Sequence, residues 1–119
     1  MTNSIYPILT TLLTDGSGNA NSTVNITGVV YGVEIQGTGY SSGTLLIESI
    51  SNGILETIIT TSVNQDIVLY PRKNISDSSG SLLLTNSTYP TVNESVKVSI
   101  SGGGVAETGD IYLYMLKDT

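Results

Sequence analysis

Turn-forming residues interrupt this chain so regularly that few folds other than an all-β one are open to it. Ser, Thr, Gly and Asn together account for 54 of the 119 residues. They leave short apolar segments between them, at a spacing of roughly 8–12 residues that is typical of β-sandwiches and β-barrels. Helix is disfavoured, because the chain has only two alanines and no stretch with apolar residues at helical spacing. The turn clusters are Asp15–Asn21, Gly37–Gly43, Ser51–Gly53, Asn64–Gln65, Lys73–Gly80, Asn86–Pro90 and Ser101–Gly104.

Eight segments have the length and composition of short β-strands. Pro7 places the first of them at a sheet edge, because proline cannot donate a ladder hydrogen bond. Asn52 and Gly53 readily adopt positive φ and predict a tight hairpin between the third and fourth segments. In the second segment the apolar residues change phase at Gly28, which predicts a β-bulge or a strand break. The segments are Ile5–Leu13, Thr23–Ile35, Thr44–Ile50, Ile54–Thr61, Asp66–Tyr70, Ser81–Thr85, Glu94–Ser101 and Gly109–Lys117.

The last two segments differ in their faces. In Glu94–Ser101, valine and isoleucine alternate with serine and lysine, so one face is buried and the other is hydrated. In Gly109–Lys117, one face carries isoleucine, leucine and methionine, whereas Tyr112 and Tyr114 lie on the other. Because both faces are bulky, the final strand is predicted either to be central in its sheet or to cover a partner.

These patterns predict a single all-β domain over residues 1–119. Eight short strands in a chain of this size favour a two-sheet antiparallel sandwich. A jelly-roll-like strand order is compatible with the pattern, which does not by itself fix the connectivity. No internal repeat, linker or second domain is visible in the sequence.

The composition excludes several classes of function. The chain has no Cys, His, Trp or Phe, which excludes disulfides, thiolate or imidazole metal ligands, and nucleophile systems built on Cys or His. Its net charge of −6, with only four Lys and Arg, argues against nucleic-acid binding. No segment is long and apolar enough for a membrane span, and no basic, apolar leader is recognisable, so synthesis in a cytoplasm is expected. No cofactor is expected.

Paired carboxylates are the one catalytic option that remains, and nothing in the sequence pairs them. They are interpreted as solubilising surface charges, and the chain is expected not to be an enzyme. The alternating oxygen-bearing residues of Asp15–Asn21 are interpreted as a polar turn, because the Gly and Glu of a calcium loop are missing. The glycines of Ser101–Gly104 are interpreted as a hairpin loop. The candidate carboxylates are Glu34, Glu48, Glu56, Asp66, Glu94 and Asp110.

The basic pair Arg72–Lys73 holds half of the chain's cations. Arginine pairs well with carboxylates, so the pair is either a contact for an acidic partner surface or ordinary solvated charge. Tyrosine is the only aromatic residue and is frequent at interfaces. Tyr31 and Tyr112 are expected to close the core. Tyr40 and Tyr89 lie in turn clusters, where they are candidates for partner contact.

Three stretches carry a resemblance to a known group of proteins: YPRK at 70–73, VKVSISGGG at 96–104 and GDIYLYML at 109–116. Together they resemble the small β-sandwich virion proteins of tailed bacteriophages, which decorate or cement capsids. The resemblance covers roughly the second half of the chain. It implies a non-enzymatic protein on the outer capsid surface that bridges subunits of the major capsid protein and forms homotrimers.

The resemblance also suggests where contacts would lie. Arg72 and Lys73 are the first candidates for contact with the shell, and the segment Thr2–Leu9 is the second. The face with Tyr112 and Tyr114 would pack in a trimer core or against a shell protein.

Two other functions stay open. The first is a carbohydrate-binding or adhesin-like module on a phage tail or head fibre, with its site on the loops that hold Tyr40 and Tyr89. The absence of Trp weakens it, because sugar platforms depend heavily on Trp. The second is a carboxylate-based glycosidase, for which the sequence places no acid pair.

Overall fold

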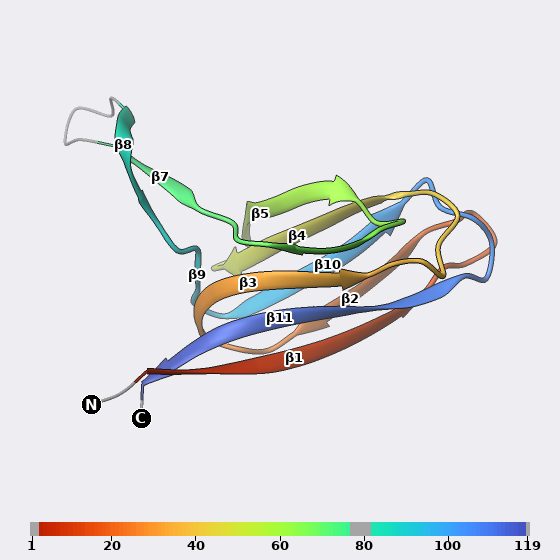
Figure 1. Cartoon of the computed structure of the whole chain (residues 1–119), viewed down its shortest axis with the longest axis horizontal. Helices are drawn as coiled ribbons and strands as arrows, with labels where there is room; N and C mark the ends of the chain where they lie inside the picture. The colour runs from red at the N-terminus through yellow and green to blue at the C-terminus, as the bar shows by residue number, and fades with distance from the viewer. Residues whose placement is uncertain (1–2, 77–81, 119) are drawn as a thin grey trace.

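The chain folds into two antiparallel sheets packed face to face (Figure 1). The computed structural model describes residues 3–76 and 82–118, in which all regular structure is β-strand. The first sheet has five strands, in the order β1–β11–β3–β6, and β9 pairs with the other end of β3. These strands are β1 (Asn3–Leu13), β11 (Thr108–Asp118), β3 (Gly28–Gln36), β6 (Asp66–Leu69) and β9 (Thr91–Val92).

The second sheet has four strands, in the order β2–β10–β4–β5. A separate two-stranded ribbon, β7–β8, projects from one end of the sandwich, as Figure 1 shows at the upper left. The strands of the second sheet are β2 (Ala20–Val24), β10 (Ser95–Ser101), β4 (Thr44–Ser51) and β5 (Ile54–Ser62). The ribbon consists of β7 (Lys73–Ser76) and β8 (Leu82–Thr88).

The strand order is that of a jelly roll. Leaving aside the ribbon and the short β9, the chain pairs its first strand with its last, its second with its second-to-last, and so inward to the β4–β5 hairpin. Successive pairs alternate between the two sheets, which is the winding of a double Greek key. The all-β sandwich predicted from the sequence is confirmed, and the strand order that the sequence left open is now fixed.

The core lies between the two sheets and is made of alternate residues from both. Val33, Ile111 and Met115 of the first sheet are fully buried, as are Leu45 and Ile47 of the second. Burying aliphatic side chains of this size is the main favourable term in folding, at about 25 cal/mol per Å² of apolar surface removed from water. The alternation also means that every second residue of each strand faces outward.

Local signals in the sequence are borne out at several positions. Asn52 and Gly53 both have positive φ, 50° and 76°, and form the tight turn of the β4–β5 hairpin. Pro7 lies in β1, which is an edge strand. The phase change at Gly28 is a strand break, because β2 and β3 belong to different sheets. The final strand is central, between β1 and β3.

Two sequence predictions change in detail. The cluster Lys73–Gly80 was predicted to be a turn, but Lys73–Ser76 pairs with β8 as a strand. This ribbon has little alternation in its sequence, so period alone does not reveal it. The strand predicted at Ser81–Thr85 corresponds to β8, which continues to Thr88. Residues 77–81 lie outside the described part of the chain.

Candidate interaction surface

The two outward faces of the sandwich differ sharply in chemistry. The outward face of the five-stranded sheet, here called the tyrosine face, exposes large apolar side chains that the alternation of the strands turns away from the core. On β1 alone, Ile5, Leu9 and Leu13 are 49%, 52% and 65% exposed. The tyrosine face consists of Ile5, Leu9 and Leu13 from β1, Tyr112 and Tyr114 from β11, Tyr31 from β3, Val68 from β6 and Tyr70 just after β6.

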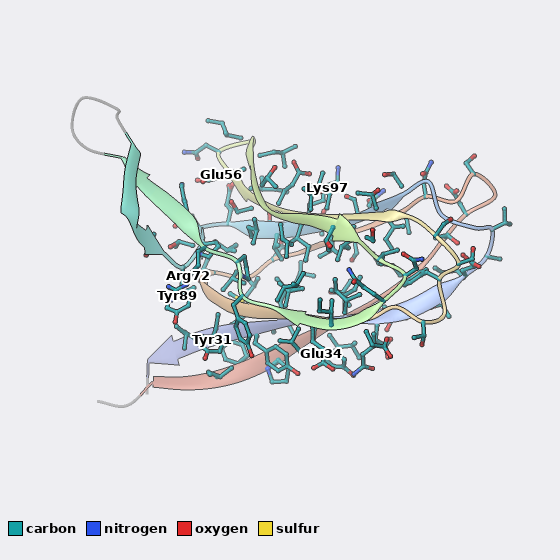
Figure 2. All side chains as sticks on the ribbon, turned by 45° about the horizontal axis from the view of Figure 1, so that its top comes forward. Tyr31, Glu34, Glu56, Arg72, Tyr89 and Lys97 are labelled. Atoms are coloured by element: carbon teal, nitrogen blue, oxygen red, sulfur yellow. The ribbon has the colours of Figure 1, made fainter. Side chains whose placement is uncertain are left out.

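The outward face of the four-stranded sheet is more polar. Lys97 of β10 lies opposite Glu48 of β4 in the register, and threonines from β2 and β5 surround them. Leu46 and Ile50 are its half-buried apolar side chains on β4. In Figure 2, Lys97 lies on one side of the sandwich, and Tyr31 and Glu34 lie on the opposite side. The four-stranded sheet also exposes an apolar side chain, since Leu55, which lies opposite Ile50, is 49% exposed, but the larger cluster is on the tyrosine face. A large cluster of this kind indicates an interaction surface, because monomeric proteins rarely expose large apolar patches.

The tyrosines of this face contact one another and continue to the base of the ribbon. The ring of Tyr31 meets that of Tyr70 edge-on, with centroids 5.6 Å apart and planes at 78°. On its other side Tyr31 lies 5.6 Å from Tyr89, which follows β8. Tyr112 and Tyr114 are stacked at 6.4 Å, with planes at 23°. Such pairs favour defined positions of the rings.

Glu34 is the acidic group at the middle of this surface. Tyr114 donates its hydroxyl hydrogen to Glu34 Oε1 at 2.5 Å, and the Gln36 amide donates to Oε2 at 2.8 Å. These two hydrogen bonds hold the pKa of Glu34 below its ordinary value, with the Tyr114 bond contributing most. The same bond raises the pKa of Tyr114. At neutral pH the surface therefore presents the Glu34 carboxylate beside the protonated hydroxyl of Tyr114.

A hollow of about 290 Å³ opens beside Glu34. Gly32 lies directly opposite Tyr114 on β3. A Cβ at Gly32 would lie 3.3 Å from the Tyr70 ring, so the glycine lets that ring pack closely on the sheet beside the hollow. The residues that line the hollow are Ile5, Tyr31, Glu34, Val68, Tyr70 and Tyr114.

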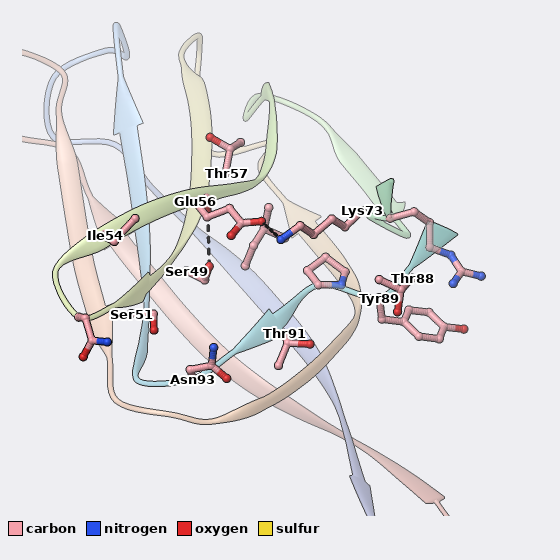
Figure 3. A pocket seen from close by; sticks show the side chains of 14 residues that line it. Ser49, Ser51, Ile54, Glu56, Thr57, Lys73, Thr88, Tyr89, Thr91 and Asn93 are labelled. Atoms are coloured by element: carbon pink, nitrogen blue, oxygen red, sulfur yellow. Dashed lines mark hydrogen bonds and ion pairs between the residues drawn. The ribbon is translucent and has the colours of Figure 1, made fainter. Parts of the chain in front are cut away.

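The structure separates the two members of the basic pair. Arg72 lies over the ring of Tyr89, with its guanidinium carbon 4.0 Å from the ring centroid, a cation–π contact (Figure 2). Lys73 starts β7 and forms an ion pair with Glu56 of β5 (Figure 3). Both ends of this ion pair are more than half exposed, so its contribution to stability is small. Arg72 thus extends the tyrosine face through Tyr89, whereas Lys73 pairs with Glu56 across a neighbouring groove that Arg72 and Tyr89 also line.

The groove that Lys73 and Glu56 bridge is open, has a volume of about 880 Å³ and lies between β5 and the segment around β9. Figure 3 shows the ion pair of Lys73 and Glu56 crossing it, with Ser49, Ser51 and Asn93 along its walls. Hydroxyl and amide side chains predominate in the lining of the groove. Of the ion pair, Glu56 comes from one wall of the groove and Lys73 from the other. The groove is therefore bridged within the chain and presents no convergent catalytic set.

Tyr40 does not take the contact role predicted for it. It lies in a loop, as expected, but its side chain is only 3% exposed. Its hydroxyl donates to the Leu12 carbonyl at 2.6 Å and lies 3.2 Å from the Gly109 carbonyl. The ring therefore closes one end of the core. Tyr31 and Tyr112, which were expected to close the core, are instead half-buried on the tyrosine face.

The remaining motifs have structural explanations. The Asp15 carboxylate accepts hydrogen bonds from the backbone of Ser17 and Asn19, which confirms the polar turn. The loop that contains the glycines of 101–104 is not the predicted hairpin loop, because β10 and β11 belong to different sheets and the loop crosses between them. Glu107 fixes this loop, since its carboxylate accepts hydrogen bonds from Ser41 and from the Gly104 backbone. In residues 3–76 and 82–118, no three acidic side chains cluster as a metal site would require.

The predicted contact residues thus fall into two groups, according to whether they lie on the tyrosine face. Tyr112, Tyr114, Tyr89 and Arg72 lie on the tyrosine face or at its end, and Lys73 and Tyr40 do not. Sequence reasoning missed Tyr70 as a member of this surface. The apolar residues at odd positions of β1 could have revealed the rest of the face. They alternate with the even-numbered residues that point into the core, so they point outward.

Comparison with protein-family models, curated proteins and solved structures found no match to this chain. Within the described residues, no helix has the length and apolar character needed to cross a membrane.

Proposed function

We propose that this protein is a non-enzymatic structural protein that attaches to the outer surface of a phage capsid and stabilises it by bridging major capsid subunits. The observation that carries the proposal is the cluster of exposed tyrosine and aliphatic side chains on the tyrosine face, which is larger than the apolar cluster on the other outward face. The identity of the shell comes from the resemblance of the YPRK, VKVSISGGG and GDIYLYML stretches to capsid decoration proteins.

A tyrosine-rich sheet face is well suited to bind protein. Tyrosine offers a large contact area, loses few rotamers on burial, and keeps a hydroxyl for hydrogen bonds at the rim. Stable interfaces bury about 800 Å² on each partner. The proposal extends to association of three copies, in which the β1 part of this face would meet a neighbouring copy.

Co-sedimentation with capsid shells of the source phage tests the proposal. The wild-type protein is expected to bind saturably, at a copy number on the order of hundreds per particle, because decoration follows the symmetry of the shell. A Tyr112→Ser/Tyr114→Ser variant is expected to lose binding while remaining folded. The matched control, Leu46→Ser/Ile50→Ser on the other outward face, should bind as the wild type does. Equal binding by both variants, or no binding by the wild type, would refute the proposal.

The basic pair gives a second test. An Arg72→Ala/Lys73→Ala variant should bind shells more weakly without unfolding, because Arg72 extends the tyrosine face. Single variants separate the two residues: Arg72→Ala should account for the loss, and Lys73→Ala should leave binding unchanged. Retained shell binding by the double variant would count against a contact role for the pair.

A carbohydrate-binding role remains the second candidate, and one observation favours it. The hollow beside Glu34 combines tyrosine rings with a carboxylate, and such a combination also suits sugars. Tyr40 no longer contributes to this candidate, because its side chain is buried. A glycan array distinguishes the two functions: saturable binding to a defined glycan, lost in a Tyr70→Ala variant, would favour the sugar-binding role.

A further inference from the structure

The hollow in the tyrosine face has an unusual lining. Three tyrosine rings, from Tyr31, Tyr70 and Tyr114, surround a single carboxylate, that of Glu34. The faces of aromatic rings are electron-rich and attract cations, and a nearby carboxylate strengthens this preference. The combination is chemically matched to an organic cation with an apolar stem.

The carboxylate of Glu34 can still pair with a cation and accept further hydrogen bonds. Both of its hydrogen bonds come from neutral groups, the Tyr114 hydroxyl and the Gln36 amide. Each carboxylate oxygen can accept a second hydrogen bond. Among the side chains that the structure describes, the one ion pair is that of Lys73 and Glu56, and Glu34 is not paired with any of these cations. Its pKa lies below the ordinary value, so it is ionised at neutral pH.

We infer that this hollow receives a lysine or arginine side chain from the protein to which the tyrosine face binds. The inference rests on the proposed function and specifies the chemistry of the partner. The cationic group would lie against the tyrosine rings and Glu34, and its alkyl stem would pack on Ile5 and Val68 at the rim. The chain itself contains the same kind of contact nearby, where Arg72 lies 4.0 Å over the ring of Tyr89. The net charge of −6 makes a basic partner surface electrostatically favourable.

The inference can be tested without the partner. Isotope-labelled protein is titrated with three capped tripeptides, Gly-Lys-Gly, Gly-Arg-Gly and Gly-norleucine-Gly, and the backbone amide shifts are followed by NMR. We expect saturable shifts around Glu34, Val68 and Tyr70 with the two cationic peptides at millimolar concentrations, and none with norleucine. In a Glu34→Gln variant the affinity should fall by about tenfold or more, because the charge is lost while the shape is kept. The matched control, Glu48→Gln on the other outward face, should leave it unchanged.

Several results would overturn the inference: no saturable shifts at the hollow, equal shifts from norleucine, unchanged affinity in Glu34→Gln, or saturable binding of monosaccharides in place of the cationic peptides. The test is separate from that of the proposed function. If the peptides fail to bind but Tyr112→Ser/Tyr114→Ser still abolishes co-sedimentation, only the inference falls. If the peptides bind and no shell does, the inference holds for another protein partner and the capsid proposal falls.

Discussion

Replacing Tyr40 by Phe removes one hydroxyl from a closed end of the core. That hydroxyl donates to the Leu12 carbonyl at 2.6 Å, in a side chain that is 3% exposed. An intramolecular hydrogen bond contributes about 0.5–1.5 kcal/mol, and an acceptor left buried and unpaired adds to the loss. We therefore expect Tyr40→Phe to lower the free energy of unfolding by about 1–2 kcal/mol. For a domain of this length, that corresponds to a fall in Tm of about 3–10 °C.

Chemical denaturation followed by circular dichroism measures this change directly. Tyr70→Phe is the matched control, because the Tyr70 side chain is 59% exposed and its replacement should change stability by less than about 0.5 kcal/mol. A Tyr40→Ala variant should lose about 3–5 kcal/mol, since it leaves a cavity in addition. Equal stabilities of the Tyr40→Phe and Tyr70→Phe variants would refute the structural role assigned to Tyr40 and return it to the candidates for surface contact.

Three further predictions concern the loops and the core. Gly18→Ala should lower the free energy of unfolding by about 2 kcal/mol or more, because φ of Gly18 is +77° and the new Cβ would lie 1.9 Å from the Gly103 carbonyl oxygen. Gly16→Ala is the control: the space around Gly16 is open, so this change should alter thermal denaturation little. Hydrogen bonds, chiefly those from Ser41, hold the pKa of Glu107 below its ordinary value. They therefore stabilise the fold at pH values above that ordinary pKa, and this contribution is lost as the pH falls. Between about pH 7 and about pH 3, the Glu107→Gln variant should therefore lose less stability than the wild type does. Leu113→Ala should cost about 2–5 kcal/mol in urea unfolding and Leu9→Ala much less, because only the first is buried; equal losses would mean that the two faces are wrongly assigned.

Local sequence signals predicted most of the strands because they act within a few residues. Asn52–Gly53 determines its own turn through positive φ, and Pro7 is compatible only with an edge. The bulky faces of 109–117 predicted a strand that is either central or covers a partner, and β11 is central. These features depend on alternation and turn chemistry, which the sequence displays directly.

The positions of the tyrosines depend on tertiary structure instead. Tyr40 is the one aromatic residue in a loop of glycines and serines, and nothing local shows that the loop folds over the end of the core. The outward position of Tyr31 reflects the irregularity where Tyr114 pairs with Gly32 and Met115 pairs with Val30. A bulge of this kind turns a residue to the opposite face of the sheet, and the alternation of apolar residues in the sequence does not reveal it.

The candidate surface could be predicted only in part for the same reason. Tyr112 and Tyr114 share a strand, so their common face follows from the sequence. The hollow, however, brings together Tyr31 and Glu34 of β3, Tyr114 of β11 and Tyr70 just after β6, because the jelly-roll winding places these strands side by side. Arg72 and Lys73 are neighbours in sequence, yet one contacts Tyr89 and the other Glu56.

Tyrosine footprinting on capsid shells tests the central claim most directly. Free protein and shell-bound protein are exposed to the same brief oxidative pulse, and modification is read residue by residue by mass spectrometry. Acetylation of Lys97 reports in parallel on the other outward face. We predict that Tyr70, Tyr112 and Tyr114 are protected on the shell while Lys97 stays as reactive as in the free protein. Unchanged modification of these tyrosines, together with protection of Lys97, would contradict the assignment of the tyrosine face as the binding surface.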